Sequence, residues 1–160
     1  MAHAIPDGLH AIVPHLVVKG ASEAIEFYKR AFGAVEHCRI PDQSPAGANR
    51  LMHASVQIGD SRLYLVDEMP EHGCLGPNGS SPVTIHLNVT DVDATFERAV
   101  EAGATPIMPP ADMFWGDRYG RLIDPFGHHW SMAEHVEDLS PEQMRANMAE
   151  ACRKEPCEVG

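Results

Sequence analysis

Two histidines, His15 and His86, each open a stretch of sequence that occurs twice in the chain. The first copy covers residues 15–34 and the second covers 86–104. Both read as a β-rich run, a helix start, an amphipathic helix and a closing Gly-Ala pair. Neutral imidazole binds divalent transition metals, so histidines at matching repeat positions suggest a site between the copies. The alternative is that each is a packed or hydrogen-bonded strand residue.

A second group of residues that could take part in binding or catalysis is the polar and aromatic stretch around residue 117. Its candidate substrate-binding residues are Trp115, Arg118 and Tyr119. An arginine there can pair with an acidic substrate, and a tryptophan can stack on a ring. The competing interpretation is a hairpin contact between Asp117 and Arg118, with Trp115 as packing. The sequence leaves both open.

The elements that must position these residues follow the repeat. Each copy predicts a strand, a helix and three further strands, so the fold class is α+β with two βαβββ modules. Ser22 is predicted to cap the first helix, and Asp91 or Asp93 the second. The modules are predicted at 11–68 and 83–138, joined by a turn-rich linker at 69–82, within one domain covering 1–160. The predicted strands are 12–18, 34–40, 50–58, 61–67, 83–89, 105–110, 117–123 and 129–135.

The C-terminal segment carries a helix start of its own. Ser140-Pro-Glu-Gln143 offers a cap, a proline in the first turn and a glutamine at the capping-box position. We therefore predict a C-terminal helix at 140–153. Its Met144 and Met148 share one face, to be laid on the body or on a partner chain.

Composition and charge limit the partners and the cellular location that can be expected. The formal net charge of −11 argues against nucleic acid and against an anionic membrane surface. There is no apolar run long enough to span a bilayer and no secretory signal pattern at the start. The scattered cysteines (Cys38, Cys74, Cys152 and Cys157) are expected to be free thiols, and we expect a cytoplasmic protein.

Five stretches in order carry a family resemblance. They are Val13-Pro-His-Leu-Val-Val-Lys-Gly20, Ala24-Ile-Glu-Phe-Tyr-Lys-Arg-Ala-Phe-Gly-Ala34, Gly59-Asp-Ser-Arg-Leu-Tyr-Leu65, Trp115-Gly-Asp-Arg-Tyr-Gly120 and Asp124-Pro-Phe-Gly-His-His-Trp130. Over about residues 11–138 the chain resembles the vicinal oxygen chelate superfamily of glyoxalase I, bleomycin-resistance proteins and extradiol dioxygenases, and more narrowly its PhnB-like branch. The resemblance implies a curved mixed sheet around a cleft, where a divalent metal often sits.

In the enzymes of this superfamily, four ligands come from the first and last strands of each half. The equivalent places in this chain are Val13, Leu65, Thr84 and Ser131. None supplies the expected imidazole or carboxylate, which speaks against glyoxalase I activity itself. Side chains two apart on a strand share a face. The alternative ligand set that this parity predicts is His15, His86, Asp67 and His129, which is able to hold Zn, Ni, Mn or Fe.

The resemblance leaves two functions open. The first is a glyoxalase-like, metal-dependent or formerly metal-dependent lyase or isomerase that acts on a small oxygenated molecule. Glu134 would be its catalytic base, if a bulge turns it into the cleft; otherwise it is a solvated strand-end residue. The second is a non-catalytic protein of the bleomycin-resistance type that binds and sequesters a small molecule such as a cationic aromatic compound, which the acidic surface and the lack of standard ligands favour. The superfamily also implies a homodimer, because partner chains commonly complete its clefts.

Overall fold

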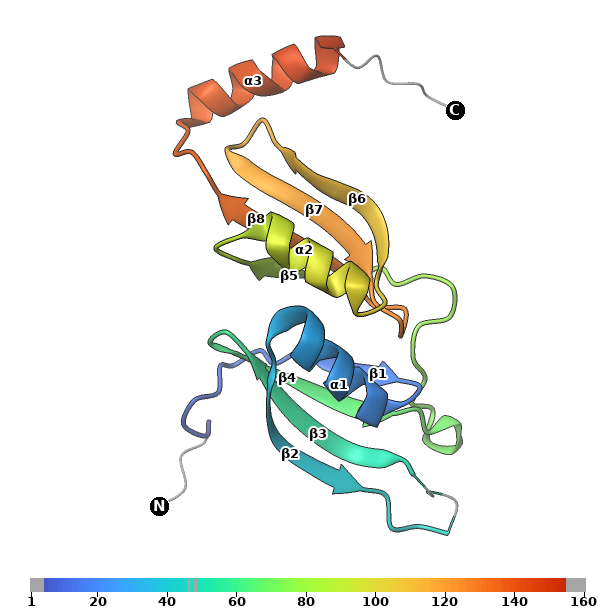
Figure 1. Ribbon diagram of the computed structural model, residues 1–160. Coiled ribbons are helices and arrows are strands. Elements are labelled where there is room, and N and C mark those ends of the chain that lie inside the picture. Colours follow the sequence, from blue (N-terminus) through green and yellow to red (C-terminus); the bar gives the residue numbers. More distant parts are fainter. Residues whose placement is uncertain (1–4, 46, 48, 155–160) are drawn as a thin grey trace.

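The computed structural model describes residues 5–45, 47 and 49–154, and it contains two separate four-stranded mixed sheets (Figure 1). The first sheet has the strand order β1-β4-β3-β2 and the second the order β5-β8-β7-β6. Their strands are β1 (His15–Val18), β2 (Val35–Pro41), β3 (Leu51–Ile58), β4 (Ser61–Asp67), β5 (Thr84–Asn88), β6 (Thr105–Asp112), β7 (Asp117–Ile123) and β8 (His129–His135). The predicted α+β class with two βαβββ modules is confirmed.

The two sheets repeat each other in strand pairing as well as in order. In each, the first and last strands of the module pair in parallel, and the remaining neighbours are antiparallel. His15 pairs with Tyr64, and His86 pairs with Ser131. The two histidines therefore do occupy corresponding positions in the two modules.

Helices α1 (Ala21–Phe32) and α2 (Val92–Glu101) each cover one face of their own sheet and contact each other between the sheets (Figure 1). Strand side chains alternate between the helix-covered face and the open face. Leu16 and Leu65 pair with each other and are buried under α1, whereas His15 is exposed on the opposite, open face.

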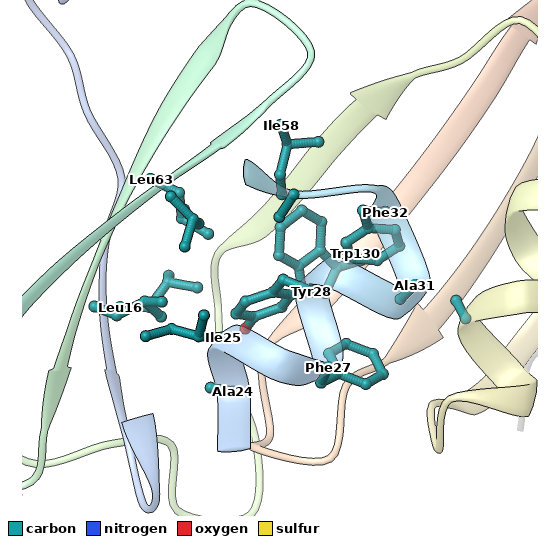
Figure 2. Packing of buried hydrophobic residues seen from close by; sticks show 14 of the residues in the cluster. Leu16, Ala24, Ile25, Phe27, Tyr28, Ala31, Phe32, Ile58, Leu63 and Trp130 are labelled. Atoms are coloured by element: carbon teal, nitrogen blue, oxygen red, sulfur yellow. The ribbon is translucent and has the colours of Figure 1, made fainter. Parts of the chain in front are cut away.

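The core at the junction of the modules is aromatic (Figure 2). The ring centroid of Trp130 lies 5.5 Å from that of Tyr28 and 4.7 Å from that of Phe32. The Tyr28 hydroxyl and the Trp130 indole both donate to Oδ2 of Asp124, over 2.6 and 2.9 Å. Burial, and then the neighbouring Asp124 carboxylate, raise the pKa of Tyr28 well above its ordinary value.

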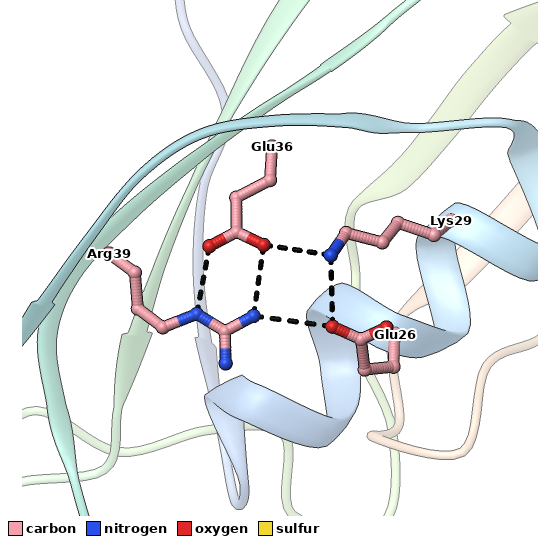
Figure 3. Close-up of polar contacts among 4 residues, drawn as sticks. All are labelled: Glu26, Lys29, Glu36 and Arg39. Atoms are coloured by element: carbon pink, nitrogen blue, oxygen red, sulfur yellow. Dashed lines mark hydrogen bonds and ion pairs between the residues drawn. The ribbon is translucent and has the colours of Figure 1, made fainter.

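An ion-pair network on the surface ties α1 to β2 (Figure 3). Lys29 and Arg39 each bridge the carboxylates of Glu26 and Glu36. The guanidinium of Arg39 and the ammonium of Lys29 lower the pKa of Glu36 to about 2.

The C-terminal helix α3 (Pro141–Lys154) starts as predicted. The backbone N–H of Gln143 donates to Oγ of Ser140, and the backbone N–H of Ser140 donates to Oε1 of Gln143. None of its residues is buried, and α3 projects from the β6–β7 end of the second sheet (Figure 1). No helix in the described residues is long and apolar enough to cross a membrane.

The linker between the sheets contains a short 3-10 helix, Pro70–His72. Cys38, Cys74 and Cys152 are free thiols, as expected, and Cys157 lies outside the described residues.

Candidate functional site

A pocket of about 350 Å³ lies where the first module meets the edge strand of the second. Three segments line it: residues 10–14 ahead of β1, residues 58–63 of the β3–β4 hairpin, and residues 85–88 of β5, with Trp130 completing the wall. Ile12, 85% exposed, is one of its outer residues, and Leu63 and Trp130 belong to the buried core. Its size and apolar lining are typical of small-molecule sites.

His86 lines this pocket and is held in place through both ring nitrogens. Nδ1 lies 2.8 Å from Oγ of Ser131, and Nε2 lies 3.2 Å from Oδ1 of Asn88. An amide oxygen only accepts, so Nε2 carries a hydrogen, and Nδ1 of the neutral ring accepts from the serine hydroxyl. Neither nitrogen of His86 has a lone pair free for a metal without breaking a hydrogen bond.

His15 lies in different surroundings, although its position in the repeat is the same. It borders a second pocket, formed with linker residues 75–82 and His128. Its ring packs edge-on against Tyr64 and His53, with centroids 6.0 and 6.3 Å away. Burial, and then the nearby His53, lower the pKa of His15 below its ordinary value. The two histidines thus face separate pockets.

Asp67 lies on the face opposite to the predicted one. It is buried beneath α1, where its carboxylate accepts from the backbone N–H groups of Gly20, Ala21 and Leu51, over 2.7 to 2.9 Å. The prediction that Ser22 caps α1 is also wrong, because the N-cap residue is Gly20, which has no side chain to cap the helix. Asp67, at the end of β4, instead accepts the hydrogen bonds of the backbone N–H groups at the start of α1. The parity that placed Asp67 in the cleft was wrong, since His15 pairs with Tyr64 and not with Leu65.

Glu134 has the corresponding role in the second module, where it accepts a hydrogen bond at the start of α2. It stands three residues after Ser131, as Asp67 stands three after Tyr64, so the two carboxylates are equivalent in the repeat. Its Oε2 accepts from the backbone N–H of Val92, the first residue of α2, over 3.1 Å. Asp91 caps the same helix, as predicted, by accepting from Ala94. Glu134 is therefore directed toward α2 rather than into the pocket.

The candidate substrate-binding residues separate onto two faces. Tyr119 lies on the open face, where it stacks on His86 at 6.1 Å between centroids, and Trp115 stands edge-on to it at 5.5 Å. Arg118 lies on the helix side, paired with Asp93 through two hydrogen bonds of 2.6 and 2.9 Å and with Asp112. The expected contact between Asp117 and Arg118 does not form. Asp117 instead accepts from the Trp115 indole and bonds to His135.

The sequence interpretation did not single out Arg62, which lines the pocket from the start of β4. Its Nη1 donates to Oγ of Ser55 over 3.2 Å. Its Nε is buried and has no hydrogen-bond partner in the part of the chain that the structure describes. No spacing or motif marks this arginine, and only the tertiary arrangement that brings the β3–β4 hairpin and β5 to one pocket shows that it lines that pocket.

Comparison with known proteins identifies the family. Residues 8–132 match the model of the Glyoxalase/Bleomycin resistance protein/Dioxygenase superfamily. The chain belongs to this superfamily. It is 46% identical to the uncharacterized protein Mb0911c of Mycobacterium bovis over 145 residues, which are 87% of this chain and 92% of that one.

Solved structures share the architecture of this chain. Protein PA1353 of Pseudomonas aeruginosa is 28% identical, with a TM-score of 0.64 over 79% of this chain and 98% of that one. A Bacillus cereus structure described as a putative 3-demethylubiquinone-9 3-methyltransferase, PhnB protein, shares the fold at 17% identity, with a TM-score of 0.62 over 78% of this chain and 99% of that one. The fold expected from the resemblance is thereby confirmed.

The metal that superfamily membership implies does not fit the residues present. Within residues 5–45, 47 and 49–154, no group of three or more His, Cys, Asp or Glu side chains is arranged to hold an ion. Of the four predicted ligands, Asp67 is occupied by a helix start and His86 by two hydrogen bonds. His129, at the start of β8, pairs with Thr84 on the same face as His86. These side chains do not form one coordination sphere.

Proposed function

We propose that this protein binds a small, mainly apolar, oxygenated molecule in the pocket between its modules, and that binding needs no metal. The pocket of about 350 Å³ carries this proposal. It combines core residues such as Leu63 and Trp130 with the polar groups of Arg62, His86 and Asn88. A largely apolar wall with a few placed polar groups supplies affinity from burial and orientation from hydrogen bonds.

The aromatic surface beside the pocket supports the same function. His86 lines the pocket and stacks on Tyr119, which Trp115 contacts edge-on. A planar ligand that extends out of the pocket would meet these rings on the open face of the second sheet. This arrangement favours the binding and sequestration function over the lyase or isomerase function. The carboxylate expected to act as base, Glu134, is engaged at the start of α2.

The test uses Trp130 as a reporter. The chain has two tryptophans, and Trp115→Phe leaves Trp130, whose side chain lines the pocket. Titration with 4-phenylbutanoate, which has an apolar body and an oxygen head, should change the emission of Trp130 with a Kd below about 1 mM. Excess EDTA should leave that Kd unchanged.

A blocking variant and a matched control locate the binding. Val13→Phe places a larger side chain in the pocket wall and should abolish the titration, whereas Ile107→Phe introduces the same aromatic side chain on β6, outside this pocket. Saturable binding that survives Val13→Phe, or an absence of binding in the unblocked protein, would overturn the proposal. Binding that EDTA abolishes would overturn its metal-free part.

A further inference from the structure

We infer that the pocket selects anionic ligands and that Arg62 is the residue that binds their carboxylate. This inference rests on the proposed function and deepens it, because it names the chemical class of the ligand. It starts from a charge that the protein leaves unmatched.

Arg62 is half-buried and lacks an acidic partner. The only hydrogen bond of its side chain in the described residues is from Nη1 to Oγ of Ser55, and no carboxylate of those residues lies within ion-pair distance. Asp60, the one acidic residue of the pocket lining, accepts from the hydroxyl of Ser61 instead. A buried guanidinium nitrogen without a partner is costly unless a ligand supplies one.

A comparison with other arginines shows that Arg62 does not lack an ion pair because acidic residues are scarce. The chain has 23 Asp and Glu residues against 12 Lys and Arg. Arg50 also has a buried Nε without a partner, but its Nη2 pairs with Asp42 and Glu71. Arg118 pairs with Asp93 and Asp112. Among the arginines of the described residues, Arg62 is the one that combines a buried Nε without a hydrogen-bond partner with the absence of an ion pair, and it lies at the small-molecule pocket.

The remaining lining agrees with an anionic head on an apolar body. His10 and the Asn88 amide add groups able to donate hydrogen bonds, while Ile12 and Leu63 offer apolar surface. The planar guanidinium matches the geometry of a carboxylate, which it binds with two parallel N–H···O bonds. Nη2 of Arg62 makes no hydrogen bond in the part of the chain that the structure describes and is not among the buried atoms, whereas Nε is unpartnered but covered by protein atoms.

The experiment compares 4-phenylbutanoate with its neutral isostere 4-phenylbutanamide by calorimetry, on the full chain. The unmodified protein should bind the carboxylate about tenfold more tightly than the amide. Arg62→Gln should weaken carboxylate binding at least tenfold and change amide binding less than twofold. Arg145→Gln, which removes one charge from the exposed face of α3, should change neither. Arg62→Lys keeps the charge without the planar fork and should fall between.

The outcomes separate this inference from the proposed function. If both compounds bind equally, and Arg62→Gln changes neither, the pocket is a small-molecule site and the role of Arg62 is wrong. If neither compound binds, both proposals fail. The unfolding temperature of Arg62→Gln without ligand should match or exceed that of the unmodified protein, because the variant removes an unpaired charge. A variant that is substantially less stable would assign Arg62 a structural role and overturn the inference.

Discussion

The hydroxyl of Tyr28, on the helix of the first module, donates over 2.6 Å to Oδ2 of Asp124, in the turn before the last strand of the second module. Asp124 is 3% exposed, and its other donors are the Trp130 indole and the backbone N–H groups of Phe126 and His128. Residues 96 positions apart are thus joined at one carboxylate that is fully satisfied.

Tyr28→Phe should therefore lower the free energy of unfolding by about 1–3 kcal/mol, because it deletes a buried hydrogen bond to a charged group. Urea unfolding followed by circular dichroism measures this loss. Tyr64→Phe is the control, since the Tyr64 hydroxyl has no hydrogen bond within the described residues and its side chain lies on the open face. Equal losses in the two variants would contradict a special role for Tyr28.

The helix-capping carboxylates give a second prediction. Asp67→Asn should cost about 2 kcal/mol, because Asp67 accepts from three backbone N–H groups. Glu134→Gln should cost about 0.5 kcal/mol, since Glu134 accepts from one and Asp91 also caps α2. Both variants should bind 4-phenylbutanoate normally. Loss of binding in a folded variant would contradict this prediction and would show that the carboxylate contributes to the binding site.

The ion-pair network predicts an acid-dependent loss of stability. The pKa of Glu36 is lowered to about 2 in the folded protein, so its contribution is present above its unfolded value and is lost as the pH falls toward 2. We expect about 1 kcal/mol, because surface pairs are screened by water. Glu36→Gln should reduce the loss of stability between pH 5 and 2. The exposed Glu97→Gln, outside any ion pair in the described chain, should not.

His135 gives a prediction near neutral pH. Hydrogen bonds to Asp117 and then Asp138 raise its pKa above the ordinary value. Its stabilising effect is full below the unfolded pKa and is lost as the pH rises through the raised one. Proton NMR should show the raised pKa, and Asp117→Asn should lower it. An unchanged His135 titration in Asp117→Asn would contradict the assignment.

The homodimer implied by the superfamily remains a prediction. Light scattering should give twice the chain mass of 17.5 kDa. A mass equal to one chain, measured at the concentrations of the binding experiments, would contradict it.

The fold was predictable because its signals are local. Strand composition and the repeated helix pattern placed the strands within a few residues of their observed bounds. The largest difference is β1, which begins at His15 and not at residue 12. The capping box at Ser140 involves neighbours in sequence and was also found.

The site was harder to predict because it depends on long-range pairing. Taking Leu65 as the cleft-facing residue moved Asp67 to the wrong face, since a one-residue error in register inverts every side chain of a strand. The partners of Asp67 at the start of α1 lie 46 and 47 positions away. Arg62 was missed because an unpaired charge can be recognised only when all its neighbours are known.

The shared carboxylate of Asp124 has a consequence for the rate of ligand association. Trp130 forms part of the pocket wall, and its indole bonds to the same Asp124 oxygen that receives the Tyr28 hydroxyl. The first module therefore holds the wall against which a ligand must dock, and we predict that ligand entry involves no hinge motion between the modules. Association with such a preformed site needs no gating step, so its observed rate should rise linearly with ligand concentration without reaching a plateau.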